Sequence, residues 1–293
     1  MTFKESYNLP RAALAITLAG LMFASMGVFV RYASASLPSE VLVFLRNSFG
    51  LLLLLPWLYH HGFRNLKTNR LSGHVTRSVT GLAAMYCFFY AIAHLPLAEA
   101  VLLNFSSPIF TAIIALLWLG EEATRKLLLT IAIGFSGICL ILKPGIGILS
   151  TAALVGLISA VFAAMAMVSI RDLSKTEPTR RIVFYFSVTA TLISAIPMFW
   201  YWQTPDLKPL LAMVFAGFSA TLGQLLLTHG YSLAPAARVS PYSYNTIIFA
   251  AIYGWIFWSE TPDILTLFGA LLIISAGIIT LLSRPTRSLT EPD

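Results

Sequence analysis

The sequence predicts an all-α membrane protein in which ten transmembrane helices form two inverted five-helix repeats. Of its 293 residues, 58% are apolar and 11% are charged, which is more apolar surface than a soluble domain of this length can bury. The apolar residues fall into ten runs, each long enough to cross about 30 Å of hydrocarbon as a helix. A stretch at residues 96–121 also recurs at 235–260.

Lipid offers no hydrogen-bond partners to the backbone, so apolar runs of this length must be helical. We expect helices at residues 12–31, 39–59, 74–94, 97–119, 126–142, 150–170, 181–202, 209–231, 235–258 and 263–283. The first run has 19 residues, Ala12 to Val30, and is followed by Arg31. It is longer than an ordinary signal-peptide core, so we expect it to be the first spanning helix.

The last helix has a recognisable start. Thr261 is the predicted N-cap, with Pro262 at the first helical position and Asp263 facing the positive end of the helix. In the fifth and tenth helices, small residues such as Gly134, Gly137 and Gly269 predict close helix packing.

Basic residues predict the orientation. With the N-terminus in the cytoplasm, 15 of the 19 lysines and arginines fall in cytoplasmic segments, as the positive-inside rule requires. Both termini are therefore predicted to be cytoplasmic, and the protein to lie in the cytoplasmic (inner) membrane. The basic residues sit in short links rather than on one face, so no nucleic-acid partner is predicted.

An odd number of helices in each half reverses the second half relative to the first. We expect repeats at residues 1–145 and 146–293. Inverted repeats provide two packings of similar energy, each open to one side, with a binding site near the midplane. This arrangement is typical of a carrier that works by alternating access.

The repeated stretch carries one asymmetry. Adding 139 takes Pro96 to Pro235 and Glu121 to Glu260, but it takes Glu99 to Arg238. Because the two copies run in opposite directions, Glu99 is expected at the outer mouth of the bundle. Arg238 is expected at the inner mouth.

Arg46 is the sharpest single candidate, because a guanidinium inside an apolar helix costs several kcal/mol unless it faces protein or water. It either anchors a substrate anion on the cavity wall or pairs with a carboxylate or carbonyl groups to fix its helix.

Two polar stripes extend these charges into the bundle. Ser106 lies on the face of Glu99, and Tyr242 and Asn245 lie on the face of Arg238. Glu99 could bind protons or attract a cation, or could stabilise a helix start. Arg238 could line the pathway or be one more positive-inside residue.

Prolines predict where the helices bend. Pro108 cannot donate a hydrogen bond to the carbonyl of Asn104. That carbonyl either faces the substrate or is satisfied by Ser106 or Ser107. Bends are expected at Pro96, Pro108, Pro235 and Pro241.

Aromatic side chains form a further stripe. Tyr86, Tyr90 and His94 share one helix face, and Gln224 begins a comparable stripe on the eighth helix. Aromatic walls of this kind suit a metabolite that carries a ring or a quaternary ammonium or sulfonium centre. The same tyrosines could instead belong to interfacial belts.

These motifs give the chain a family resemblance. It resembles the drug/metabolite transporter superfamily, and within it the ten-helix EamA-type transporters. The resemblance rests on FLRNSFG at 44–50, YAIAHLPLAEAVLLNFSSPIF at 90–110, LGEEAT at 119–124, GFSGICLILKPG at 134–145 and WSETP at 258–262. It implies a cavity lined by helices 1 to 4 and 6 to 9, with helices 5 and 10 behind. Arg238 and Pro241 depart from the small and acidic residues more usual there.

We therefore expect a secondary active transporter of a small organic metabolite, coupled to protons or working by exchange, as a monomer or homodimer. The resemblance makes amino-acid or nucleoside-like metabolites candidates, including S-adenosylmethionine. Alternatives are a drug/metabolite efflux pump of broad specificity, a membrane enzyme acting on lipid-linked substrates, and a passive channel or scaffold. No Walker loop, HExxH or CxxC motif occurs, so no enzyme, cofactor or metal site is predicted.

Overall fold

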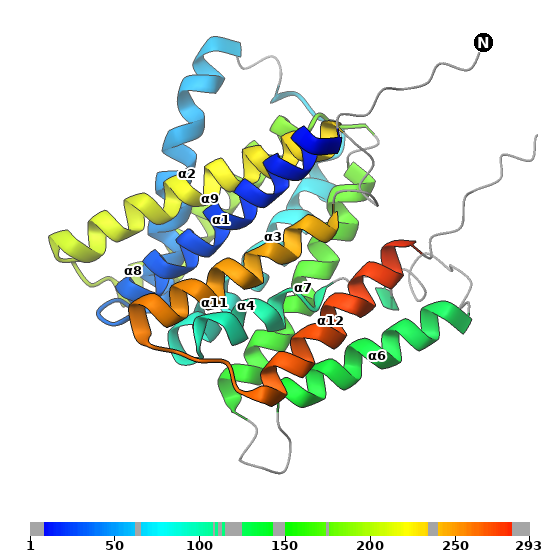
Figure 1. Cartoon of the computed structure of the whole chain (residues 1–293). Helices are drawn as coiled ribbons and strands as arrows, with labels where there is room; N and C mark the ends of the chain where they lie inside the picture. The colour runs from blue at the N-terminus through cyan, green and yellow to red at the C-terminus, as the bar shows by residue number, and fades with distance from the viewer. Residues whose placement is uncertain are drawn as a thin grey trace, which may run out of the picture.

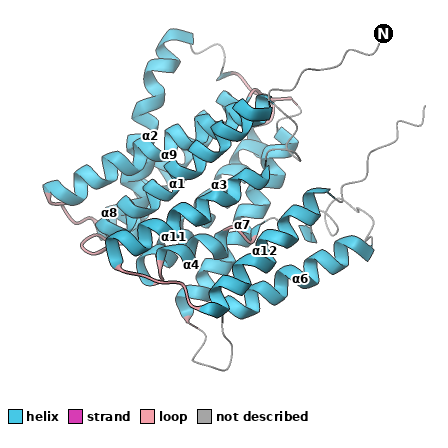
Figure 2. Ribbon diagram, viewed as in Figure 1, coloured by secondary structure: helices cyan, strands magenta, loops and turns pink. Residues whose placement is uncertain are grey.

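The structure is a computed structural model that describes residues 9–61, 66–107, 109–110, 113–114, 125–142, 150–173, 176–233 and 240–282. All regular secondary structure in these residues is helical (Figure 2). The helices are α1 (Leu9–Ser34), α2 (Ser39–His61), α3 (Leu71–His94), α4 (Leu97–Asn104), α6 (Arg125–Leu142), α7 (Thr151–Leu173), α8 (Thr179–Tyr201), α9 (Leu207–Leu233), the 3-10 helix η2 (Ser240–Tyr244), α11 (Asn245–Trp258) and α12 (Ile264–Leu282).

Eight of the expected helices are confirmed, with both ends within three residues. Six of the described helices, α1, α2, α3, α7, α8 and α9, contain stretches long and apolar enough to cross a membrane. Helices α6 and α12 contain shorter apolar segments, at 131–141 and 264–276. The apolar runs of the sequence thus locate most of the bundle.

The expected continuous helix over 97–119 is wrong. Helix α4 ends at Asn104, and the amide of Ser106 bonds to the carbonyl of Leu103 at 3.1 Å, in the tighter 3-10 pattern. Pro108, which lies outside the described residues, has no N–H to continue the α-helical ladder.

The expected helix over 235–258 is wrong in its first part. Residues Ser240–Tyr244, which include Pro241, form the 3-10 helix η2 before α11 begins. Residues 234–239, with Pro235 and Arg238, lie outside the described residues. The start of α12 also differs, because the helix begins at Ile264 and Asp263 caps it. The Asp263 carboxylate accepts a hydrogen bond from the amide of Thr266 at 2.8 Å, so the prediction of Thr261 as N-cap was wrong.

Each helix of the first half packs against a helix of the second (Figure 1). Five such pairs are α1 with α9, α3 with α7, α2 with α8, α4 with α11 and α6 with α12. If α1, α2, α3, α4 and α6 are exchanged for α7, α8, α9, α11 and α12 in that order, this set of pairs maps onto itself. Two further kinds of contact between the halves follow the same rule, since α2 with α9 becomes α8 with α3, and α1 with α11 becomes α7 with α4.

The two ends of the bundle are distinguished by their acidic residues. At one, which we call the Glu260 end, α1 and α11 finish and α4 begins, because Glu260 contacts both Arg31 and Leu97. At the other, which we call the Glu177 end, α3 begins beside the link between α7 and α8. Helix α4 therefore starts where its partner α11 stops, and the two helices are antiparallel.

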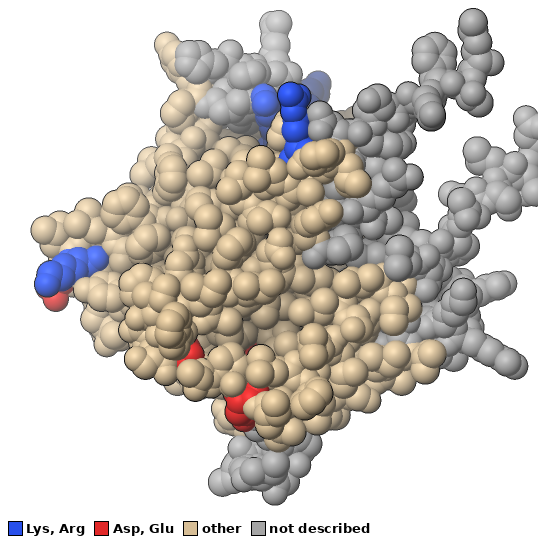
Figure 3. All heavy atoms as spheres, viewed as in Figure 1, with Lys and Arg blue, Asp and Glu red and all other residues tan. Residues whose placement is uncertain are grey.

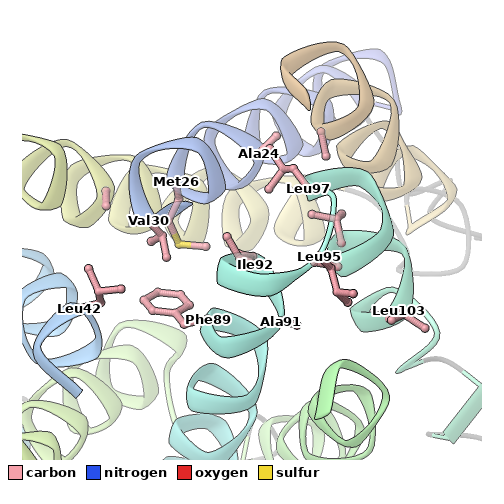
Figure 4. Packing of buried hydrophobic residues seen from close by; sticks show 14 of the residues in the cluster. Ala24, Met26, Val30, Leu42, Phe89, Ala91, Ile92, Leu95, Leu97 and Leu103 are labelled. Carbon is pink, nitrogen blue, oxygen red and sulfur yellow. The ribbon is translucent and has the colours of Figure 1, made fainter. Parts of the chain in front are cut away.

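The buried core contains residues of both halves. Phe89 of α3 is 1% exposed and lies beside Leu42 of α2 and Val30 of α1 (Figure 4). Many large apolar side chains instead point outward, such as Leu52 and Phe199 at 55% and 79% exposure. On the face in Figure 3, described charged residues lie at the margins of a broad uncharged surface. This is the surface of a protein solvated by lipid.

Glycines bring α6 and α12 together at one side of the bundle (Figure 1). A Cβ atom at Gly137 would lie 2.8 Å from the carbonyl oxygen of Gly269, and a Cβ at Gly269 would lie 2.7 Å from that of Gly137. The two backbones are thus in mutual contact, which confirms the predicted close packing of these helices.

Candidate functional site

Arg31, Leu97 and Glu260 form a contact between the two halves at the Glu260 end, which we call the latch. The carboxylate of Glu260 forms an ion pair with Arg31 at the end of α1. Its other oxygen accepts a hydrogen bond at 2.9 Å from the amide of Leu97, the first residue of α4. Pro96, the N-cap of α4, makes no side-chain capping bond, so Glu260 satisfies this helix start from the opposite half. The Arg31 guanidinium also lies 4.7 Å from the ring centre of Trp258.

A small cavity of about 120 Å³ lies beside this latch. It is lined by Pro96, Ala98, Glu99, Ala251, Gly254, Glu260, Thr261 and Pro262. Glu99 accepts a hydrogen bond at 3.4 Å from the hydroxyl of Thr266 in α12. Glu99 and Pro96 thus both line a cavity between α4 and α11.

Two polar contacts join α1 to α11. Asn245 donates to the hydroxyl of Thr17 at 3.0 Å, and Ser25 and Tyr253 share a hydrogen bond of 3.1 Å. Asn245 is therefore oriented toward α1. Tyr242 lies on η2 and is 39% exposed. Tyr242 lies in η2 and Asn245 begins α11, while Arg238 lies outside the described residues, so the face expected to join these three residues stays a prediction.

The serines and Asn104 of the expected polar stripe bond locally or to α7. The Asn104 side chain donates to the Ser159 hydroxyl at 3.1 Å, and buried Ser106 donates to the carbonyl of Leu103 at 2.6 Å. Ser107 is half-buried. Ser106 lies beyond the end of α4, so the expected alignment with Glu99 on one continuous helix does not form.

Arg46 is deeply buried in α2, at 7% exposure. It donates to the side-chain oxygen of Asn47 at 2.7 Å, and its Nε is buried without a partner. The Asn47 amide in turn lies 3.6 Å from the sulfur of Met85 in α3. The sequence left open whether Arg46 anchors a substrate anion or pairs within the protein. Among the described residues, no carboxylate forms an ion pair with Arg46.

The aromatic stripe divides into two parts. The hydroxyl of Tyr86 is buried and has no partner, whereas Tyr90 stacks on His94 with ring centres 4.2 Å apart. His94 also bonds to the carbonyl of Tyr90 at 2.8 Å. Gln224 is half-buried in α9. Among the described residues of the aromatic stripe, Tyr86 is thus the one with a buried polar atom that has no partner.

Sequence reasoning missed a polar cluster at the Glu177 end. Buried Glu177 accepts hydrogen bonds from the side chains of Thr68 and Arg181, both at 2.6 Å. His74 of α3 lies 3.9 Å from Glu177 and stacks on Tyr185, with ring centres 4.4 Å apart. The only local signal for this cluster is the four-residue spacing of Glu177 and Arg181, because its other members are far apart in the chain.

The charge of Glu177 stabilises this cluster. Burial by itself raises the pKa of the carboxyl, but the bonds from Thr68 and Arg181 and the positive charge of Arg181 outweigh burial and lower the pKa below its ordinary value. A group with a lowered pKa in the folded state stabilises the protein above its ordinary pKa, and this contribution is lost as the pH falls.

We therefore expect Glu177→Gln to lower the stability of the purified protein at pH 7 by about 1–3 kcal/mol, and the difference from wild type to vanish as the pH falls below about 4. Thermal unfolding at a series of pH values measures this. Asp172→Asn is the control, since its ion pair with Arg70 is half exposed and exposed pairs contribute little. A deficit independent of pH would contradict the prediction.

Arg77 was also missed as a site residue, because the sequence places it among the positive-inside residues. It is 8% exposed, and its guanidinium lies 4.1 Å from the ring centre of Phe186 in α8. Its Nε and one terminal nitrogen are buried without a partner. No local sequence signal distinguishes it from the solvated arginines near it.

Comparison with known proteins identifies relatives that match most of the chain. The model of the EamA-like transporter family matches residues 10–143 and again 150–282. The chain is also similar to a crystal structure of a protein with a TM-score of 0.64, over 92% of this chain and 96% of that one, at 17% identity. At that identity the likeness shows the fold alone.

Curated relatives are transporters. A pseudopaline exporter of Pseudomonas aeruginosa is 39% identical over 273 residues, covering 92% of this chain and 95% of the exporter. An S-adenosylmethionine uptake transporter of Rickettsia bellii is 28% identical, covering 88% of each chain. An uncharacterized transporter of Helicobacter pylori is 29% identical over 94% of this chain and 96% of its own length. This protein is accordingly a multi-pass membrane transporter of small molecules rather than an enzyme, and it belongs to the EamA-like transporter family.

Proposed function

We propose that this protein is a secondary active transporter that moves a small organic metabolite across the cytoplasmic (inner) membrane by alternating access. The observation that carries the proposal is the latch at the Glu260 end, where one carboxylate of the second half holds the ends of two helices of the first half. A contact of this kind can close one mouth and be released without unfolding either half.

The two halves act as inverted repeats, residues 1–145 and 146–293. The exchange symmetry of the helix pairs and the antiparallel course of α4 and α11 support this arrangement, as do the two separate family matches. Inverted repeats imply a second conformation in which the mouth at the opposite end closes and the Glu260 end opens.

The Glu260 end faces outward and both termini lie in the cytoplasm. Support comes from the 15 of 19 basic residues that this orientation places in cytoplasmic segments. The clustering of Arg70, His74 and Arg181 at the Glu177 end agrees with it. The structure then represents a state closed to the outside.

Export is the direction best supported, because the relative with 39% identity is named an exporter, whereas the relatives with 28% identity are named uptake transporters. Candidate substrates are amino-acid or nucleoside-like metabolites, S-adenosylmethionine among them.

Flux measurements test the function. Purified protein in liposomes loaded with a metabolite mixture is expected to release one class of metabolite when a pH gradient or an external exchange solute is supplied. Empty liposomes and protein in liposomes without either driving force are the controls. Absence of gradient-driven or exchange flux for every metabolite class would overturn the proposal.

Glu99 is proposed as the proton-coupling residue, because its carboxylate lines the cavity at the closed mouth. Glu99→Gln is expected to keep exchange but reduce pH-gradient-driven transport by about tenfold or more, as measured by flux at several pH values. Glu40→Gln, which removes a carboxyl at the start of α2, is the control. If Glu99→Gln keeps the rate and pH dependence of wild type, Glu99 only stabilises the start of α4.

A further inference from the structure

The side chain of Arg77 extends into the bundle, whereas a positive-inside residue is expected to extend toward the cytoplasmic interface. It lies about 9 Å along α3 from the Glu177 end of the helix. Long basic side chains near a helix end normally extend toward the interface. The Arg77 guanidinium instead lies over Gly81, one turn further into the bundle, where a Cβ atom would be only 2.1 Å from its terminal nitrogen.

Gly81 is what allows this orientation. The guanidinium occupies the space above Gly81 and is held on its other side by the ring of Phe186 at 4.1 Å. Any side chain at position 81 would displace it. The cationic group is thus positioned inward by two neighbours, neither of which carries a charge.

Arg46 approaches the same region from α2. Arg46 donates to Asn47 at 2.7 Å. The Asn47 amide lies 3.6 Å from the sulfur of Met85, one turn along α3 from the Gly81 that the Arg77 guanidinium covers. No described carboxylate pairs with either arginine. Around them, Arg46 Nε, Arg77 Nε, one Arg77 terminal nitrogen and the Tyr86 hydroxyl are buried without hydrogen-bond partners.

Two like charges in the interior, with several unused donors, are unfavourable without counter-charge. Guanidinium groups match carboxylates in shape and bind them through two parallel hydrogen bonds. Two acidic groups, one for each arginine, would supply the counter-charge.

We propose that Arg46 and Arg77 form a binding site for a small organic anion that carries two acidic groups, with Tyr86 donating a further hydrogen bond. The inference rests on the proposed transport function, because the anion would be the transported metabolite, or the part of it that the protein recognises. Both arginines are almost fully buried, so the anion enters when the bundle opens.

Binding is tested with the full-length protein in nanodiscs of zwitterionic lipid. Thermal unfolding is followed against sodium succinate, glutarate and citrate, with butyrate and chloride at equal ionic strength as comparisons. The di- and tricarboxylates are expected to raise Tm with at least about tenfold higher apparent affinity than butyrate. Equal effects of butyrate and the dicarboxylates, or an effect of chloride alone, would overturn the proposal.

Variants assign the effect to the two arginines. Arg46→Gln and Arg77→Gln are each expected to reduce the dicarboxylates to the affinity of butyrate. Gly81→Ala keeps both charges but displaces the Arg77 guanidinium, so it should act like Arg77→Gln. Arg70→Gln, which removes an arginine paired with Asp172 near the start of the same helix, should keep the preference. A preference that survives Arg77→Gln would contradict the assignment.

The ligand-free protein provides a second readout. Removing an unpaired buried charge relieves an unfavourable interaction, so Arg77→Gln should unfold at a higher temperature than wild type without ligand. A lower temperature would mean that Arg77 is stabilised within the protein, and would overturn the inference.

Anionic lipid could supply the same acidic groups as a soluble metabolite. Repeating the titrations in nanodiscs with anionic lipid separates the two sources. If the metabolite occupies the site, the affinity for succinate is unchanged. If anionic lipid abolishes the succinate effect, the site belongs to a lipid headgroup and the metabolite proposal fails.

Flux in liposomes separates this inference from the proposed function. Transport of neutral or cationic metabolites only would refute the anion site and leave the transporter intact. Selective stabilisation by dicarboxylates without any flux would support the site and count against transport.

Discussion

Replacing Glu260 with glutamine is expected to open the Glu260 end of the bundle. The change removes the ion pair with Arg31 and weakens the bond to the amide of Leu97, which no other side chain caps. The loss is about 1–3 kcal/mol, and it falls only on the closed state. Because each 1.4 kcal/mol corresponds to a factor of ten, the open state should gain roughly tenfold in population.

Thiol labelling measures this opening. In a background with Cys87→Ala and Cys139→Ala, Ala98→Cys places a thiol on the wall of the cavity beside Glu260. A membrane-impermeant maleimide added outside should react about ten times faster in the Glu260→Gln variant. Asp263→Asn is the matched control, because it removes a carboxylate at the same end that caps α12. Equal labelling rates with and without Glu260→Gln would exclude the latch as the closing contact.

Gly137→Ala is expected to destabilise the protein although alanine is the better helix former. Helix propensity alone favours alanine by about 1 kcal/mol. The added Cβ, however, would lie 2.8 Å from the backbone oxygen of Gly269, and neither backbone can move without separating α6 from α12. Overpacking of this kind costs about 1–3 kcal/mol, and more for a larger side chain.

Thermal unfolding of a graded series checks the sign. Gly137→Ala should lower Tm by a few degrees, and Gly137→Val by roughly 5–10 °C. Ser136→Ala, on the exposed face of the same helix, should leave Tm unchanged. A rise in Tm for Gly137→Ala would show that helix propensity outweighs the contact.

The sequence by itself determined where most helices lie and that the chain has two related halves. An apolar run in lipid has no alternative to a helix, so eight helices are located within three residues of their observed ends. The prediction of continuous helices failed near Pro108 and Pro241. There a missing N–H allows several backbone paths, and the path taken depends on which donors and acceptors lie nearby.

Only the tertiary structure decided which charged residues meet. Glu260 binds the amide of Leu97 across 163 positions, and Glu177 binds Thr68 across 109. The direction of the Arg77 side chain depends on the free space over Gly81 and on a ring from another helix. A local pattern reports how one helix is solvated, whereas the partners of a buried charge are set by helix packing. This is why the sequence could indicate Arg46 as a candidate but could not reveal that Arg77 is a second buried arginine without a described carboxylate partner.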